Sequence, residues 1–360
     1  MKTLHLAILI ITGIFLPMLG LMPMLPAQAT TQYAPSSSFG MSGNASGQFP
    51  FLPTNIAINS TGFIFVTETE NDRVQIFDSS GNWKQVIAGE HHKSNCSMEG
   101  CNVISYDSTN GHFYAPTSIA INSTGFIFVA DTGNDRVQIF DSSGNWKKTI
   151  GKTGYISVQF SSPRGIAINS TGFIFVADTG NDRIQIFDSS GNWKKSFGMF
   201  GFNSGQFHEP YDIAINSTGF IFVADAANNR VQIFDSSGNW KKSFGEAGNA
   251  SGQFYLPTGI AINNNGFIFV ADQINHRIQI LDSSGSWMKS FDEADNAPFK
   301  YYQSYGIAIN STGFIFVADT TNHHIQIFRP MQIVPEFPFA VPVFLVSIAS
   351  LIAFYRIRKI

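Results

Sequence analysis

The apolar and polar positions of the chain follow one pattern that occurs six times. The apolar segment Gly-Phe-Ile-Phe-Val begins at six glycines, Gly62, Gly125, Gly172, Gly219, Gly266 and Gly313. The first two starts are 63 residues apart and the later ones are 47 residues apart, so the first unit contains an insertion of 16 residues, at about 90–112. A period of this length predicts the blades of a β-propeller rather than a helical solenoid.

Each unit predicts four short strands separated by turns. In the third unit the strands cover residues 165–168, 173–177, 183–187 and 193–197, and Asn, Asp, Ser and Gly fill the turns between them. The second strand is apolar at every position, which predicts burial on both faces. The fourth strand is the most polar and contains lysines, which predicts the outer edge of the blade.

The two ends of the repeat array complement each other. The sixth unit ends after its third strand, at Phe328, and has no fourth strand. Residues Ser36–Phe39, ahead of the first unit, match the end of a fourth strand. We therefore predict an all-β fold within residues 30–330, a six-bladed propeller of four-stranded antiparallel blades that this N-terminal strand closes.

The repeated unit resembles the NHL repeat. In the third unit the resemblance is carried by residues 176–187 (Val-Ala-Asp-Thr-Gly-Asn-Asp-Arg-Ile-Gln-Ile-Phe), by Ser196-Phe197-Gly198 and by Gly205-Gln206-Phe207. It extends over residues 36–328. The resemblance implies a six-bladed propeller, and it implies a binding platform, because NHL propellers commonly act as one.

An acidic and a basic residue flank the second turn of most units. The pairs are Asp131/Arg136, Asp178/Arg183, Asp225/Arg230 and Asp272/Arg277, with Glu68/Arg73 in the first unit and Asp319/His324 in the last. Residues that recur in every blade have a role that is common to all blades, such as fixing the turn. We interpret them as structural pairs that fix the turn.

Both ends of the chain contain targeting patterns. Residues 4–25 form an apolar run, and Ala27-Gln28-Ala29 follows it as a small-x-small pattern. Together they predict a cleaved signal peptide over residues 1–29 and a mature chain starting near Thr30. An uncleaved N-terminal anchor is the alternative. At the other end, residues 339–360 combine a 17-residue apolar stretch with three final cations, which predicts a membrane helix.

The linker at residues 331–338 contains Pro335, Glu336 and Phe337. With the apolar stretch and the basic end, this motif resembles the archaeal PEF C-terminal sorting signal. The resemblance implies that an archaeosortase cuts near the motif and transfers the protein to a lipid anchor. A permanent transmembrane helix is the alternative. Either reading predicts an exported protein anchored at the cell surface.

The overall charge argues against one class of partner. The formal net charge is −3, and only 13% of the residues are charged. Some NHL relatives bind RNA, but export and the lack of a basic patch predict that no nucleic acid is a partner here.

The candidate binding site lies where the blades differ. Just ahead of the first strand of each unit, Arg164, Tyr211, Asp212 and Tyr305 depart from their counterparts, and His208 is close by in the sequence. We predict that these five residues surround the mouth of the central channel and bind a small polar or zwitterionic ligand. Ordinary loop variation around a water-filled channel is the alternative.

A catalytic site at the channel mouth is the alternative to a binding site. Some NHL-like propellers are enzymes, including the peptidylglycine amidating lyase, whose zinc is held by histidines from several blades. The histidines outside the insertion are scattered here, at His208, His276, His323 and His324, and do not occupy matching positions of three blades. We therefore predict no cofactor and no metal.

Three functions remain open. The first is a non-catalytic module that binds a protein, a glycan or a small ligand. The second is an extracytoplasmic hydrolase or lyase with its site at the channel mouth. The third is a structural part of a surface layer, which predicts ordered self-assembly of the purified domain.

The insertion contains the only two cysteines of the chain, Cys96 and Cys101. In an exported protein, cysteines this close predict a small disulfide loop. His91, His92 and His112 lie nearby, but their spacing does not fit a standard zinc site.

Asparagine in the Asn-x-Ser/Thr pattern occurs at Asn44, Asn59, Asn95, Asn122, Asn169, Asn216, Asn249 and Asn310. Export makes these residues candidates for glycosylation. Five of them belong to the same Asn-Ser-Thr-Gly turn, which turn chemistry explains without a glycan.

Overall fold

The fold was analysed in a computed structural model that describes residues 32–43, 45–49, 53–87, 96–97, 100–101, 108–291 and 304–331. Nearly all of them belong to one compact unit, Ala34–Arg329, and a second unit comprises Met1–Tyr33 and Pro330–Ile360. The predicted signal peptide, the PEF motif and the C-terminal helix lie outside the described residues. Among the residues that are described, no helix is long and apolar enough to cross a membrane.

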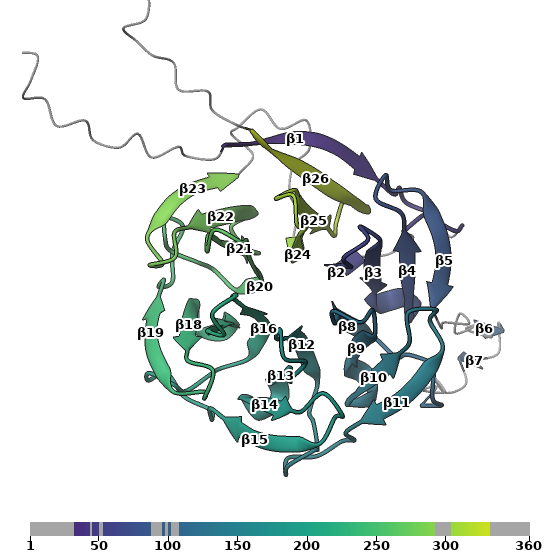
Figure 1. The fold of residues 1–360 in the computed structure, drawn as a ribbon, viewed down its shortest axis with the longest axis horizontal. Helices are drawn as coiled ribbons and strands as arrows, with labels where there is room; N and C mark the ends of the chain where they lie inside the picture. Colours follow the sequence, from purple (N-terminus) through teal and green to yellow (C-terminus); the bar gives the residue numbers. More distant parts are fainter. Residues whose placement is uncertain are drawn as a thin grey trace, which may run out of the picture. The chain divides into compact units, whose positions relative to one another are not determined.

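The described part of the compact unit forms six four-stranded antiparallel sheets arranged in a ring (Figure 1). Blade 1 comprises β2 (Pro53–Ile58), β3 (Ile64–Glu68), β4 (Arg73–Phe77) and β5 (Trp83–Ile87). Blade 2 comprises β8 (Pro116–Ile121), β9 (Ile127–Asp131), β10 (Arg136–Phe140) and β11 (Trp146–Ile150). Blade 3 comprises β12 (Pro163–Ile168), β13 (Ile174–Asp178), β14 (Arg183–Phe187) and β15 (Trp193–Phe197).

The second half of the ring repeats this order. Blade 4 comprises β16 (Pro210–Ile215), β17 (Ile221–Asp225), β18 (Arg230–Phe234) and β19 (Trp240–Phe244). Blade 5 comprises β20 (Pro257–Ile262), β21 (Ile268–Asp272), β22 (Arg277–Leu281) and β23 (Trp287–Phe291). Blade 6 comprises β24 (Ser304–Ile309), β25 (Ile315–Asp319), β26 (His324–Met331) and β1 (Gln32–Phe39).

Burial within each blade follows the predicted pattern. All five residues of β13 are buried, whereas β15 is mostly exposed and lies at the edge of its sheet. The core fills the spaces between neighbouring blades, as in the apolar cluster that joins blades 3 and 4 around Phe207. Gly198 lies against the Phe207 ring, and a Cβ on Gly198 would come within 2.3 Å of that ring. Gly198 and its counterparts in other blades have φ values of +87 to +90°. A glycine is therefore required at this approach.

The acidic and basic residues at the second turn pair as predicted, in the buried interior. Asp178 accepts hydrogen bonds from Arg183 Nε at 2.8 Å, from Gln185 and Asn181 side chains at 3.0 Å, and from the backbone N–H of Ser161 at 2.8 Å. Arg183 also donates to two backbone carbonyls of the incoming linker. The pair therefore holds the linker between blades as well as the turn.

The same turn is wound in the first four blades as a short 3-10 helix. The four segments are η1 (Thr69–Asn71), η2 (Thr132–Asn134), η3 (Thr179–Asn181) and η4 (Ala226–Asn228). Each is followed by a residue in the left-handed conformation, which Asp and Asn tolerate best among residues with a side chain.

The N-terminal strand closes the ring. In blade 6 the strand order is β1-β26-β25-β24, so a strand from the start of the chain is paired with the last strand of the array. Figure 1 shows this junction of purple and yellow strands. The predicted closure by Ser36–Phe39 is confirmed, and the strand begins earlier, at Gln32. Phe39 reaches blade 1, where its ring lies 4.8 Å from that of Phe77.

The insertion contains a two-stranded sheet, β6 (Cys96–Ser97) and β7 (Gly100–Cys101). Cys96 and Cys101 are directly opposite each other in this ladder. The disulfide stays a prediction that this register permits.

The repeated asparagine turns have a structural role. Asn169 Oδ1 accepts hydrogen bonds from the backbone N–H groups of Thr171 and Phe173 and from the Thr171 hydroxyl. Asn263, which belongs to no Asn-x-Ser/Thr pattern, accepts the same two backbone bonds in blade 5. The turn therefore accounts for these asparagines, and their glycosylation stays a prediction.

Candidate binding site at the channel mouth

The first strand of each blade begins at the mouth of the central channel. In blade 3, Pro163 at the start of β12 pairs with Asp178 at the end of β13. The linker that enters a blade and the turn between its second and third strands therefore share one face. Hydrogen bonds across the blades also hold this face, because Thr132 and Thr179 donate to the carbonyls of Pro163 and Pro210 in the next blade.

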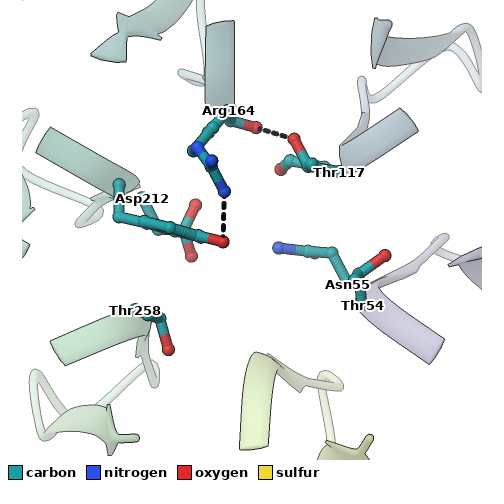
Figure 2. Close-up of a pocket in the computed structure, with 8 residues that line it drawn as sticks. Thr54, Asn55, Thr117, Arg164, Asp212 and Thr258 are labelled. Carbon is teal, nitrogen blue, oxygen red and sulfur yellow. Dashed lines mark hydrogen bonds between the residues drawn. The ribbon is translucent and has the colours of Figure 1, made fainter. Parts of the chain in front are cut away.

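A small cavity at this mouth brings together three of the predicted site residues, Arg164, Tyr211 and Asp212. The cavity is lined by Thr54, Asn55, Thr117, Ser118, Arg164, Tyr211, Asp212 and Thr258. Its volume is about 10 Å³, which is room for about one water molecule. Arg164 Nη1 donates to Tyr211 Oη at 2.5 Å, and its guanidinium carbon lies 4.6 Å from the centre of the Tyr211 ring (Figure 2).

Asp212 is buried between neighbouring first strands. It is 6% exposed, and its Oδ2 accepts a hydrogen bond from the backbone N–H of Ile260 in blade 5 at 3.1 Å. On the other side, a Cβ on Gly165 would lie 2.6 Å from Asp212 Cα, so the glycine permits the close approach of β12 and β16. Burial raises the pKa of Asp212 to about 7, against the opposing effect of its backbone hydrogen bonds.

Asn55 occupies the corresponding position in blade 1. Its Oδ1 accepts a hydrogen bond from the backbone N–H of Ile56 at 2.7 Å. The amide nitrogen of Asn55 is consequently turned toward the centre of the mouth, where Figure 2 shows it facing the hydroxyl oxygen that accepts the Arg164 hydrogen bond. Thr54 and Thr117 fix the surrounding backbone, since Thr54 Oγ1 contacts Thr67 and Thr117 Oγ1 donates to Arg164 O.

The other two predicted site residues are not part of this cluster as described. The His208 ring packs edge-on against Phe200 and Phe202, with ring centres 5.2 and 5.9 Å away, and it does not line the cavity. Tyr305 lies in β24, and its side chain is outside what the structure describes. Ligand binding by the five residues stays a prediction.

The contacts of His208 lead to a feature that the sequence reasoning missed. Among the described residues, eight exposed large apolar side chains recur from blade to blade, namely five tryptophans of the outer strands and three phenylalanines that follow the asparagine turns. The other nine are Met41 and, within residues 155–274, Tyr155, Ile156, Val158, Met199, Phe200, Phe202, Tyr255 and Ile274. A comparison of the linkers could have found them, because Phe202 replaces the Asn that occurs at the matching positions 44 and 249.

These side chains belong to the same face as the mouth. The linker carbonyls of Ile156 and Phe202 accept hydrogen bonds from Arg183 and Arg230, which begin the third strands of blades 3 and 4. Tyr155, Phe200 and Phe202 are 79%, 57% and 66% exposed. We call residues 155–158 and 199–202 the aromatic linkers.

In the part of the chain that the structure describes, no group of three or more His, Cys, Asp or Glu side chains is arranged to hold a metal ion.

The repeated unit matches models of two known protein families. A model of the NHL repeat matches residues 160–187, 207–234, 254–281 and 306–328, and a model of the teneurin NHL domain matches residues 32–141. The chain is built of NHL repeats. Each NHL match in blades 3 to 5 runs from the buried linker phenylalanine through the third strand, which is the part that holds neighbouring blades together.

Three known proteins are similar to this NHL propeller, one in the sequence of a short segment and two in fold. Protein brain tumor of Drosophila melanogaster is 46% identical over 44 residues, which are 12% of this chain and 4% of that protein. A streptogramin B lyase structure has a TM-score of 0.56 at 15% identity and covers 84% of this chain and 98% of its own. A chain of the nidogen–laminin complex has a TM-score of 0.55 at 14% identity and covers 80% of this chain and 98% of its own. At these identities the solved structures show a common fold alone.

Proposed function

We propose that this NHL propeller is an exported, surface-anchored module that binds a protein partner through the aromatic linkers, without catalysing a reaction. The exposed aromatic side chains on one sector of the mouth face are the observation that carries the proposal. Aromatic residues and methionine are enriched at protein interfaces, where a few of them supply most of the binding energy. The aromatic side chains replace the residues found at the same positions of other linkers and expose apolar surface. Exposed apolar surface lowers solubility, so its presence here indicates an interaction site.

The position of the aromatic linkers supports a recognition role. Arg183 and Arg230 anchor their backbone to the blades, so the exposed side chains project from fixed loops. Such preorganised loops lose little conformational entropy when a partner binds. The export and anchoring parts of the proposal rest on the two terminal sequence patterns, which lie outside the described residues.

The decisive experiment replaces three aromatic side chains by residues that sister linkers already contain. Tyr155→Asn and Phe202→Asn introduce the residue of position 249, and Phe200→Ala introduces that of position 247. We expect the triple variant to melt like the wild type and to bind its partner about a hundredfold more weakly, since each hot-spot residue contributes about 2 kcal/mol or more and losses are not additive.

The partner would be identified by cross-linking on intact cells and then measured in purified form. Phe126→Ala is the matched control, because Phe126 is exposed next to the asparagine turn on the opposite face. Equal binding by the wild type and the triple variant would exclude the aromatic linkers as the interface.

A hydrolase or lyase with its site at the channel mouth is the second candidate. It is favoured by one observation, a buried carboxyl group on Asp212 whose pKa is raised to about 7, which suits a general acid or base. Arg164 could stabilise a developing negative charge in the same cavity. Loss of a measured activity in Asp212→Asn, without any loss of thermal stability, would favour this enzyme over the binding module.

A further inference from the structure

Arg164 differs from the arginines of the repeat in its surroundings. The five arginines that begin third strands each contact a buried carboxylate at 2.6 to 2.8 Å, and they are Arg73, Arg136, Arg183, Arg230 and Arg277. Arg164 is half-buried and donates to Tyr211, and no carboxylate among the described residues lies within ion-pair distance of it. A partly desolvated guanidinium without a counter-ion favours an anion from outside the chain.

Asp212 does not supply that counter-ion, although it lines the same cavity. Its Oδ2 is bound to the backbone N–H of Ile260, which directs the carboxyl group into the contact between blades 4 and 5. Burial raises its pKa to about 7, so near neutral pH the group carries only part of a negative charge and repels an incoming anion less than an ordinary aspartate would.

A second donor faces Arg164 from the other side of the mouth. The carbonyl oxygen of the Asn55 amide is bound to the backbone of Ile56, so the amide nitrogen points to the centre of the cavity (Figure 2). Within the described residues, no acceptor is bound to this nitrogen. The mouth therefore offers N–H donors from blades 1 and 3 around one small space.

We propose that the mouth of the propeller channel binds a carboxylate group, held between the Arg164 guanidinium and the Asn55 amide nitrogen. The guanidinium matches the planar carboxylate in geometry as well as in charge. The cavity, about 10 Å³, has room for about one water molecule, so it admits a single carboxylate oxygen, and the rest of the ligand stays above the mouth. This site is separate from the aromatic linkers, so it can be tested without the proposed protein interface.

The test measures acetate binding to the purified full chain by titration calorimetry, at constant ionic strength with chloride as the balancing anion. We expect saturable binding to the wild type. Arg164→Thr should weaken it about tenfold or more, the usual loss when a charge-assisted hydrogen bond is removed. Threonine stands at the matching position in three blades, at Thr54, Thr117 and Thr258, so the fold already accepts it.

Two further variants separate the site from general charge effects. Asn55→Ser, which introduces the residue of the matching Ser118, should also weaken binding. Arg329→Thr removes an exposed arginine at the end of β26 and should leave binding unchanged. An equal loss in Arg164→Thr and Arg329→Thr would overturn the proposal, as would the absence of saturable binding in the wild type.

A second probe identifies the source of the carboxylate. A short amidated peptide with a single glutamate is titrated beside acetate and inorganic phosphate. Tighter binding of the peptide, sensitive to Arg164→Thr, supports an acidic side chain as the natural ligand, and equal binding of acetate supports a free carboxylate. Phosphate binding that exceeds both, with the same sensitivity, would overturn the assignment to a carboxylate.

Discussion

At the scale of single residues, the mouth of the propeller stands apart from the repeat because of Asp212. A buried carboxyl group without a cation is costly when it is charged. The buried acids at the second turns of the first five blades offset part of this cost through an arginine, as Asp178 does with Arg183, although burial still raises the pKa of Asp178. Among the described residues, only backbone N–H groups donate to Asp212, and burial raises its pKa to about 7. Its protonation is therefore coupled to folding.

The sign of this coupling gives a prediction for Asp212→Asn. The unfolded chain releases this proton near pH 4 and the folded chain near pH 7, so ionisation of Asp212 destabilises the wild type as the pH rises between these values. The variant lacks this effect, and asparagine already occupies the matching position 55. We expect its free energy of unfolding, relative to the wild type, to increase by up to about 4 kcal/mol from about pH 4 to about pH 8.

Denaturant unfolding at several pH values measures this difference. Asp188→Asn is the control, because Asp188 is only partly buried and a hydrogen bond from Lys194 holds its pKa below the usual range, so it stays ionised throughout this window. A difference for Asp212→Asn that does not change between the two pH values would show that the folded protein keeps Asp212 ionised.

At the scale of secondary structure, the strand β1 determines whether the ring of blades is closed. It is the outer strand of blade 6, and it places Phe39 against Phe77 in blade 1. Without it, the backbone groups of β26 would form an open edge, which invites pairing with another chain. The contact between blades 6 and 1 would also lose part of its apolar packing, to which Phe39 belongs.

Removal of residues 1–39 should therefore open the ring, whereas removal of residues 1–31 leaves β1 in place. We expect the longer deletion to lower the melting temperature by about 10 °C or more, because a loss of several kcal/mol shifts a domain of this size by a few degrees per kcal/mol. Calorimetry measures the melting, and size-exclusion chromatography detects association through the exposed edge. Identical behaviour of the two deletions would contradict closure by β1 in solution.

At the scale of the whole molecule, the proposed function depends on where the mature chain begins and ends. The propeller unit is complete in the described residues without the terminal segments, since its last described strands end at residue 331 and its first begins at residue 32. Processing at both ends would thus leave the blades intact. The propeller would then remain linked to the surface through residues beyond β26.

Mass spectrometry of the protein isolated from its cells tests both ends. We expect the mature chain to begin at Thr30 and to end near the Pro335-Glu336-Phe337 motif, with a lipid in place of the apolar tail. The physical reason is that the apolar run at each end is bounded by a processing pattern. A peptide that extends intact through Ile360 would instead show a permanent C-terminal helix.

Local patterns were sufficient to predict the blades. The alternation of apolar strands and polar turns recurs six times, so the strands at residues 165–168 and 193–197 could be assigned to within two residues, and the missing last strand could be assigned to Ser36–Phe39. The assignment was possible because the unit repeats. Each blade contacts its neighbours in the same way, so the strands assigned in one unit apply to all six.

The tertiary structure alone decided which side chains meet. Sequence comparison singled out Arg164, Tyr211 and Asp212, but only the folded ring shows that Arg164 binds Tyr211 while Asp212 binds the backbone of Ile260. In the folded protein the His208 ring packs against the aromatic linkers and does not line the cavity. The repeat determines where each backbone position lies in the ring, whereas the direction of a side chain at the mouth depends on contacts between blades, which no single unit contains.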